Sequence, residues 1–223
     1  PEPAAAATLP AAPAPTLPPP AYACPLAVAD FNTVLCLDGA NQFEIANTSA
    51  LGPVQRVALS SDGGLVAYVA GPFDGIPQLW VVNGDGSNAR KLVGPEQLSA
   101  SQPDSVSWPR ALQWQAGTHN IFFDTGWTPT GGAGGPGEYI NSDLWQVNAD
   151  SGDLNQILTP GTAGVFSVSP DGNWVALSQP DSIDLISADG ATQHQDAITF
   201  PGISTYSEYA YKPPVTWSAD SAF

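Results

Sequence analysis

Short apolar runs separated by turn-forming residues repeat along most of the chain. In the clearest unit, an apolar run at 57–59 leads through a Ser-Ser-Asp-Gly-Gly turn into a second run at 65–69. A third run follows at 78–82, and a more polar one at 90–93. Because Asp can bond to its own backbone and Gly accepts positive φ, such segments are typical of tight hairpins. The pattern predicts a four-stranded antiparallel meander.

The same order of strand, turn and strand returns further along the chain. It recurs at 166–177 with a third strand and turn at 183–190, and in a divergent form at 111–123 and 143–152. A last copy opens at 215–223. The turn positions Asp62, Ala116, Asp171 and Asp220 are separated by 54, 55 and 49 residues. Spacing this even predicts one supersecondary unit repeated about every fifty residues.

A four-stranded sheet that is apolar on both faces cannot bury itself alone. Sheets arranged radially about an axis can, since each covers its neighbour. The sequence therefore predicts an all-β fold, a β-propeller of four-stranded antiparallel blades with about three to four blades visible. The alternative all-β fold is a sandwich, which would place turns every 8 to 12 residues without requiring the same four-strand pattern to recur.

The organisation along the chain follows from this repeat. Residues 1–20 contain 8 Pro and 7 Ala, which predicts a solvated, polyproline-like linker or stalk over 1–21. The alternative is a disordered terminus without a function. Residues 22–223 form the expected propeller, with a partial first unit in 21–54. A closed ring needs about four blades, so we expect either an open arc or, preferably, a piece of a longer protein.

Several repeats resemble a known family. Ser169-Pro170-Asp171-Gly172 before an apolar strand, and the segment 79–92, look like the repeats of TolB-type, WD-like propellers, which are related to the amino-terminal propellers of prolyl-oligopeptidase and dipeptidyl-peptidase proteins. The resemblance covers about 55–223, with departures at Ser61, where the family has Pro, and at Ala116. It implies a fold and says little about function.

Charge and composition exclude several classes of protein. The chain carries 5 Lys and Arg against 21 Asp and Glu, a formal charge of −16, which argues against nucleic-acid and anionic-lipid binding. No apolar stretch reaches the roughly 18 residues of a membrane-spanning helix, although a tether upstream of Pro1 is compatible with the sequence. Two cysteines in an acidic, lysine-poor chain favour a Cys24–Cys36 disulfide and a periplasmic, surface or secreted location; two buried thiols are the alternative.

Catalytic and metal-binding patterns are weak. There is no Gly-x-Ser-x-Gly elbow, and His119 and His194 occupy strand-edge contexts typical of ordinary polar residues. Two Asn/Asp/Gly turns, at 83–88 and 148–153, lack the acidic twelfth position of a calcium loop and are better interpreted as hairpin turns. We expect no catalytic residue, no metal and no cofactor in this chain.

Binding residues are expected on the long connections, which should share one face of the propeller. Aromatic side chains give large contact area at low entropic cost. The candidates in these connections are Trp108, Trp127, Tyr139, Tyr206, Tyr209 and Tyr211. The alternative is that the Gly-rich segment at 126–139 is a flexible insertion without a binding role and that Trp108 only caps a blade. By contrast, five tryptophans recur at repeat positions and are expected in the core: Trp80, Trp114, Trp145, Trp174 and Trp217.

The function expected from these features is non-covalent binding of a protein or peptide by an exported envelope or surface protein. The enzyme-class alternative is the gating propeller of a secreted prolyl-oligopeptidase-like peptidase whose catalytic domain lies outside this chain. A third expectation is a scaffold displayed on the Pro/Ala stalk.

Overall fold

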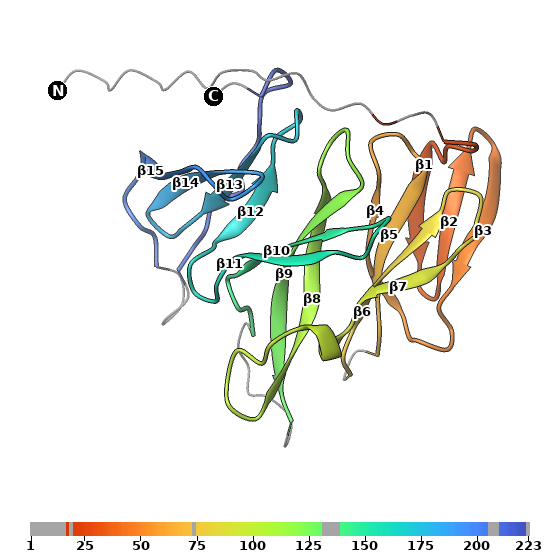
Figure 1. The fold of residues 1–223 in the computed structure, drawn as a ribbon, viewed down its shortest axis with the longest axis horizontal. Coiled ribbons are helices and arrows are strands. Elements are labelled where there is room, and N and C mark those ends of the chain that lie inside the picture. Colours follow the sequence, from red (N-terminus) through yellow and green to blue (C-terminus); the bar gives the residue numbers. More distant parts are fainter. Residues whose placement is uncertain (1–16, 18–19, 73–74, 131–138, 205–209, 222–223) are drawn as a thin grey trace.

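A computed structural model describes residues 17, 20–72, 75–130, 139–204 and 210–221. Within these residues the protein is all-β apart from one 3-10 turn, η1 (Pro95–Gln97), and its fifteen strands form four antiparallel sheets. Figure 1 shows the sheets in sequence order across the molecule, from orange at one end to blue at the other. The predicted all-β, partial propeller is confirmed, and we refer to the sheets as blades A to D.

The blades are simple meanders in which each strand pairs with its neighbours in sequence. Blade A contains β1 (Leu26–Asp30), β2 (Thr33–Asp38) and β3 (Asn41–Asn47). Blade B contains β4 (Val54–Leu59), β5 (Leu65–Ala70), β6 (Gln78–Asn83) and β7 (Arg90–Val93). Blade C contains β8 (Ser105–Trp114), β9 (Asn120–Pro129), β10 (Leu144–Asn148) and β11 (Leu154–Leu158). Blade D contains β12 (Val165–Val168), β13 (Trp174–Ser178), β14 (Ser182–Ser187) and β15 (Gln193–Thr199).

The predicted Asp-Gly turns have the same geometry in different blades. In blade B, Ser60 Oγ donates to Asp62 Oδ1 at 2.6 Å; in blade D, Ser169 Oγ donates to Asp171 Oδ1 at 2.5 Å. The glycine after each aspartate has nearly the same positive φ, 73° at Gly63 and 72° at Gly172. Partial burial alone would raise the pKa of both aspartates, but the hydrogen bonds lower it below its usual value. The two turns are therefore true structural repeats.

Neighbouring blades are joined through the middle strands, which are buried on both faces. Along β5, Leu65, Ala67 and Val69 belong to the core between blades B and C. The alternate residues Val66, Tyr68 and Ala70 belong to the core between blades A and B. Since successive side chains on a strand point to opposite faces, one strand contributes to two cores.

The same alternation continues in blade C. Ile121 and Phe123 of β9 pack toward blade B, whereas Phe122 packs toward Leu177 and Ile186 of blade D. All three β9 side chains are fully buried. The apolar runs seen in the sequence therefore reflect burial on two faces, as a radial stack of sheets requires.

Most of the repeated tryptophans lie at seams between blades and are only half-buried, whereas the Trp174 ring lies beside His194 of the same blade. Trp145 is 8% exposed, whereas Trp80, Trp114, Trp174 and Trp217 are partly exposed. Buried indole N–H groups usually find a hydrogen-bond partner, and two of these tryptophans find one across a seam, although Trp80 Nε1 has none among the described residues. Trp114 Nε1 donates to the Ala58 carbonyl at 3.0 Å, and Trp217 Nε1 donates to the Ser167 carbonyl at 3.2 Å. The expectation that all five are core residues is thus wrong in part.

The two ends of the repeat differ from its middle. Blade A has three strands, as the predicted partial unit implies. The sequence predicts that the last copy opens with a strand at 215–217, but no strand is present there in the described chain. Trp217 still makes the same type of bond to the preceding blade as Trp114 does. A β-strand is defined by its backbone hydrogen bonds to a neighbouring strand. The described residues provide no such neighbour for the segment at 215–217.

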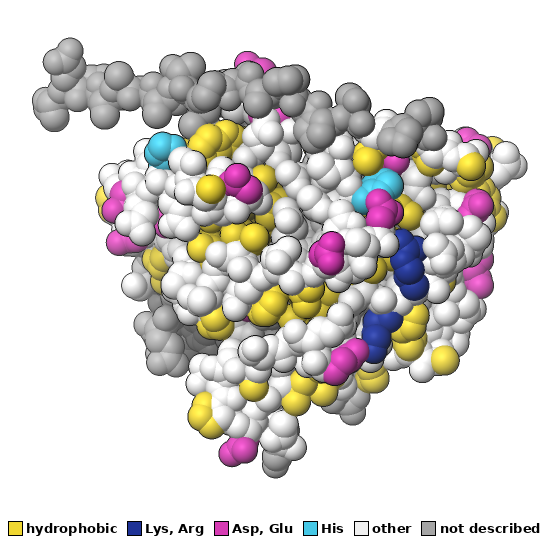
Figure 2. All heavy atoms as spheres, in the orientation of Figure 1, with side chains coloured by type: hydrophobic (Ala, Val, Ile, Leu, Met, Phe, Trp, Pro, Cys, Tyr) yellow, Lys and Arg dark blue, Asp and Glu magenta, His cyan; other side chains and the backbone are white. Residues whose placement is uncertain are grey.

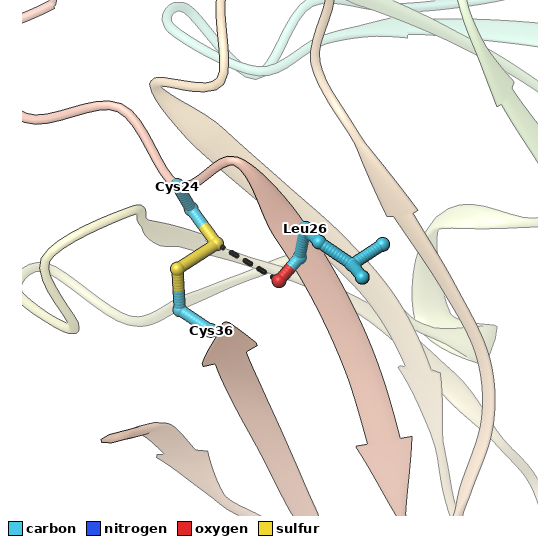
Figure 3. The surroundings of a disulfide bond; sticks show 3 residues. All are labelled: Cys24, Leu26 and Cys36. Carbon is cyan, nitrogen blue, oxygen red and sulfur yellow. Dashed lines mark hydrogen bonds between the residues drawn. A yellow bond between two sulfur atoms is a disulfide. The ribbon is translucent and has the colours of Figure 1, made fainter. Parts of the chain in front are cut away.

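The predicted disulfide joins Cys24 to Cys36, with Cα atoms 5.8 Å apart. Figure 3 shows it at the start of β1, where it ties the entry segment to β2. The Leu26 carbonyl oxygen lies 3.3 Å from Cys24 Sγ; since a disulfide sulfur carries no proton, this is a packing contact. The backbone N–H of Cys24 also donates to Gly63 of blade B at 2.8 Å, so the bridge anchors the chain entry to the first complete blade.

Substitution in β9 tests the two-sided burial. We expect Phe122→Ala and Phe123→Ala each to lower the free energy of unfolding by about 3–5 kcal/mol, because each opens a cavity in a different seam. Urea denaturation measures both. Leu26→Ala, at a side chain that is 54% exposed, is the control and should change stability by less than about 0.5 kcal/mol. A cost at only one of the two phenylalanines would contradict burial on both faces.

Candidate binding site

Blade C carries a two-stranded ribbon that extends beyond the other strands. β8 and β9 have ten residues each, and their pairing runs out to Ser105 opposite Pro129 (Figure 1). Trp108 and Trp127 therefore lie on strands, whereas the sequence predicts them on or beside the long connections. The pairing continues past the blade because 105–109 and 125–129 form a regular ladder before a bulge at Pro109–Leu112.

The two tryptophans occupy opposite faces of this ribbon. Trp127 stands opposite Ser107, whereas Trp108 stands opposite Gly126. Trp127 makes an edge-to-face contact with Tyr139, with ring centroids 4.7 Å apart. Trp108 lies over Gly126, where an added Cβ would come within 2.6 Å of the ring, and its Nε1 donates to Thr128 Oγ1 at 3.0 Å. The glycine at 126 is what allows the indole ring to lie flat on the ribbon.

A buried polar network fixes the base of the ribbon. Arg110 forms an ion pair with Asp124, whose other oxygen accepts the Ala111 N–H at 2.8 Å. Asp143 accepts the backbone N–H of Thr125 at 2.8 Å and its hydroxyl at 2.6 Å. Both aspartates are almost inaccessible, at 1% and 2% exposed. Protein groups hydrogen-bond to all four carboxylate oxygens, so the network holds the strands in place.

Burial sets the acidity of Asp124. Removal from water raises the pKa of this carboxyl above its usual value, and nearby Asp143 adds to the effect. Arg110 and the Ala111 N–H act in the opposite direction. Arg110 therefore offsets the free-energy cost of burying the negative charge of Asp124.

The described residues of blade D form an open apolar groove, which we call the blade D groove. It has a volume of about 540 Å³, and every residue lining it is apolar or aromatic: Pro180, Ile183, Phe200, Pro201, Ile203, Tyr211 and Pro213. It lies between the β13–β14 turn and the segment that follows β15. Ile203 is 60% exposed and Tyr211 is 46% exposed, which is unusual for side chains of this size.

Backbone hydrogen bonds hold the groove walls together. The Phe200 N–H donates to the Asp181 carbonyl at 2.9 Å, and the Tyr211 N–H donates to the Ile203 carbonyl at 2.8 Å. A bridge between Ser204 and Ala210 adds a further tie. Backbone hydrogen bonds therefore hold in place the segments that carry the apolar side chains of the groove.

Charged residues of both signs lie next to the groove in sequence. Residues 165–221 contain six Asp and one Glu against one Lys, and that lysine, Lys212, lies between the lining residues Tyr211 and Pro213. Asp181 is exposed in the turn between the lining residues Pro180 and Ile183. Figure 2 shows one face of the molecule, on which acidic side chains outnumber basic ones.

The aromatic candidates fall into separate places. Trp127 and Tyr139 contact each other, Trp108 lies on the opposite face of the same ribbon, and Tyr211 lines the blade D groove. Tyr206 and Tyr209 lie outside the described residues. The sequence reasoning missed the other groove residues, such as Phe200 and Ile203. The signal was an apolar run, Phe200-Pro201-Gly202-Ile203, that belongs to no repeat strand.

Comparison with known proteins shows the fold. No family model and no curated protein sequence matches the chain. Among solved structures, an oligogalacturonate lyase in complex with manganese matches with a TM-score of 0.52 at 14% identity, over 73% of this chain and 41% of that one. The dihydro-heme d1 dehydrogenase NirN matches with a TM-score of 0.53 at 17% identity, over 79% of this chain and 34% of that one.

The structural matches also include the family named from the sequence. A putative TolB from Agrobacterium tumefaciens is among them, at 15% identity over 73% of this chain and 56% of that one, with a TM-score of 0.43 that supports no further inference. At these identities the likenesses show a shared β-propeller fold and leave the activity open. The chain spans less than half the length of the two lyase structures it matches.

Two further findings concern the described residues only. None of their helices is long and apolar enough to cross a membrane. No three of their His, Cys, Asp or Glu side chains are grouped so as to hold a metal ion.

Removing the buried arginine tests the network. Arg110→Met should lower the free energy of unfolding by about 3 kcal/mol, the lower end of the range for a broken buried ion pair, because the arginine is 26% exposed. The loss should shrink as the pH falls, since Asp124 then takes up a proton and no longer buries a charge. Urea denaturation at neutral and acidic pH measures this.

The double variant Arg110→Met/Asp124→Asn is the matched control, because it removes both charges. It should be more stable than Arg110→Met alone. Equal losses in the single and double variants at every pH would rule out a role for the pair in neutralising buried charge.

Proposed function

We propose that this chain is the non-catalytic, partner-binding part of a β-propeller in an exported envelope or surface protein, and that its blade D groove receives an apolar segment of a protein or peptide. The groove itself is the observation that carries the proposal. It is large for a surface hollow, wholly apolar in its lining, and open to solvent. Exposed apolar surface of this kind typically marks an interaction site.

The shape and chemistry of the groove indicate what it binds. No lining side chain carries a charge, so recognition rests on burying apolar surface. A volume of about 540 Å³ accommodates two or three side chains of a peptide but is small for a folded domain. Tyr211 is the one lining residue with a polar tip, and its hydroxyl can hydrogen-bond to the backbone of a bound peptide.

The net charge of the chain favours a basic partner. The whole chain carries −16, and Asp181 stands exposed at the groove edge. Complementary charge raises association rates and disfavours acidic competitors. We therefore expect a bulky apolar residue flanked by Lys or Arg as the recognised element.

The proposed location rests on the disulfide. Cys24 and Cys36 are bonded, and such bonds persist in oxidising compartments such as the periplasm, the cell surface or the medium. The Pro/Ala-rich segment before the disulfide is then a spacer that holds the propeller away from an attachment point, which remains a prediction for residues 1–21.

Fluorescence anisotropy with short labelled peptides tests the function. The probes are extended peptides with a central Phe between lysines, the same peptide with Ala at the centre, and the Phe peptide with glutamates in place of lysines. We expect the Phe–Lys peptide to bind, and Ile203→Asp or Tyr211→Ser to weaken its binding about tenfold or more, since burial of a large apolar side chain is worth about 1.5–3 kcal/mol.

Leu26→Ser is the control, because it removes an equally exposed apolar side chain from blade A, at the far end of the molecule. It should leave binding unchanged. Equal binding to wild type and Ile203→Asp would refute the groove as the site. Equal binding of the lysine- and glutamate-flanked peptides would refute the expected charge preference.

A further inference from the structure

His119 lies at the seam between blades B and C, held between carboxylates of both. It ends the β8–β9 turn, with Nδ1 2.7 Å from Asp150 Oδ2 of the β10–β11 turn and Nε2 3.4 Å from Asp62 Oδ2 of the β4–β5 turn. No sequence motif signals this arrangement, because Asp62 and Asp150 lie 57 and 31 positions from the histidine. One imidazole ring thus spans two blades.

The local structure fixes all three groups. Asp62 is held through its other oxygen by Ser60 Oγ at 2.6 Å and the Gly64 N–H at 3.0 Å, which leaves Oδ2 directed at the histidine. The backbone carbonyl of His119 accepts the Ala149 N–H at 2.7 Å, next to Asp150. The His119 and Trp114 rings also meet in a T-shaped arrangement, with centroids 6.3 Å apart. The side chain of His119 is only 19% exposed.

Both contacts can be hydrogen bonds in only one protonation state. Ionised carboxylates accept hydrogen bonds and cannot donate them, whereas neutral imidazole carries a single N–H. The doubly protonated, positively charged imidazolium has an N–H on each nitrogen and satisfies both aspartates at once. Loss of the proton leaves one carboxylate facing a bare ring nitrogen.

We propose that His119 is a pH-sensitive clasp, which as imidazolium joins the Asp62 turn of blade B to the Asp150 turn of blade C and which opens when the proton is lost. The clasp stands apart from the blade D groove and does not depend on its function. Within the described residues, the equivalent seam between blades C and D has no such histidine: there Gln115 Nε2 donates to the Gly172 carbonyl at 2.8 Å, a contact insensitive to pH.

The other charged and titratable groups around the seam are mainly acidic. Asp85, on the β6–β7 turn, and Tyr22, on the entry segment, line the same cavity of about 300 Å³ as His119, Asp62 and Asp150. Arg90 is the basic residue nearby, and its guanidinium is engaged with the Ala149 carbonyl at 2.7 Å. The His119 ring therefore shares this cavity with three carboxylates, those of Asp62, Asp85 and Asp150.

The pH window follows from the ionisation of the partners. The clasp needs ionised carboxylates, so it weakens in acid strong enough to protonate the aspartates. It also needs the doubly protonated ring, so it weakens as the pH rises and the ring loses its second proton. The hydrogen bonds to Asp62 lower the pKa of that carboxyl, although partial burial opposes them, which keeps it ionised toward the acidic end. The seam should thus be tightest in mildly acidic surroundings.

Thermal unfolding of the full chain at about pH 5.5 and about pH 8 tests the clasp. We expect wild type to melt about 2–4 °C above His119→Gln at the acidic pH and within about 1 °C of it at the basic pH. His194→Gln, at an exposed histidine on β15, is the matched control and should show no such pH-dependent difference. A difference that is equal at both pH values, or absent from both, overturns the proposal.

A second variant and a second measurement keep the test decisive. Asp150→Asn removes one partner at a side chain that is 63% exposed, and should show the same pH-dependent loss even if His119→Gln fails to fold. Hydrogen exchange, corrected for its intrinsic pH dependence, should report faster opening of residues 115–119 at the basic pH in wild type only. Unchanged opening of this turn between the two pH values would also overturn the clasp.

Discussion

The structure depends on middle strands that are buried on both faces. β5 and β9 each send alternate side chains into two separate cores, so blades B and C are each held by a neighbouring blade on either side. Such a strand is stable only when sheets stack about an axis, because a single sheet would leave one apolar face in water. The even spacing of the repeat in the sequence reflects this need for sheets of similar size to stack on one another.

That constraint divides the molecule into parts that cannot vary and parts that can. The middle strands and the Asp-Gly turns are fixed by packing and by hydrogen bonds repeated between blades. Other features are not set by the repeat: the β8–β9 ribbon, the connection after β15 and the histidine side chain of residue 119 at the seam. Each adds a property that the repeat does not carry: an aromatic ribbon, an apolar groove and a charged clasp. Function in a propeller resides in such additions.

Much of the fold was predictable because local signals and global packing agree. The hairpins at Asp62 and Asp171 follow from turn chemistry and apolar runs, and the more polar strand at 90–93 follows from the turn before it. The disulfide follows from the even cysteine count and the acidic, lysine-poor composition. The site was not predictable in the same way. Trp108 and Trp127 lie on opposite faces because of strand register, and the Ile183, Phe200 and Tyr211 side chains meet only in three dimensions. The surroundings of His119 likewise depend on blade packing.

Native-state hydrogen exchange tests two-sided burial most directly. The account predicts that the slowest-exchanging amides lie in β5 and β9, which open only on global unfolding, and that β15, whose seven residues are all exposed, exchanges much faster. Slow exchange confined to the outer strands, or blades that exchange independently of one another, would contradict a structure held together through its middle strands.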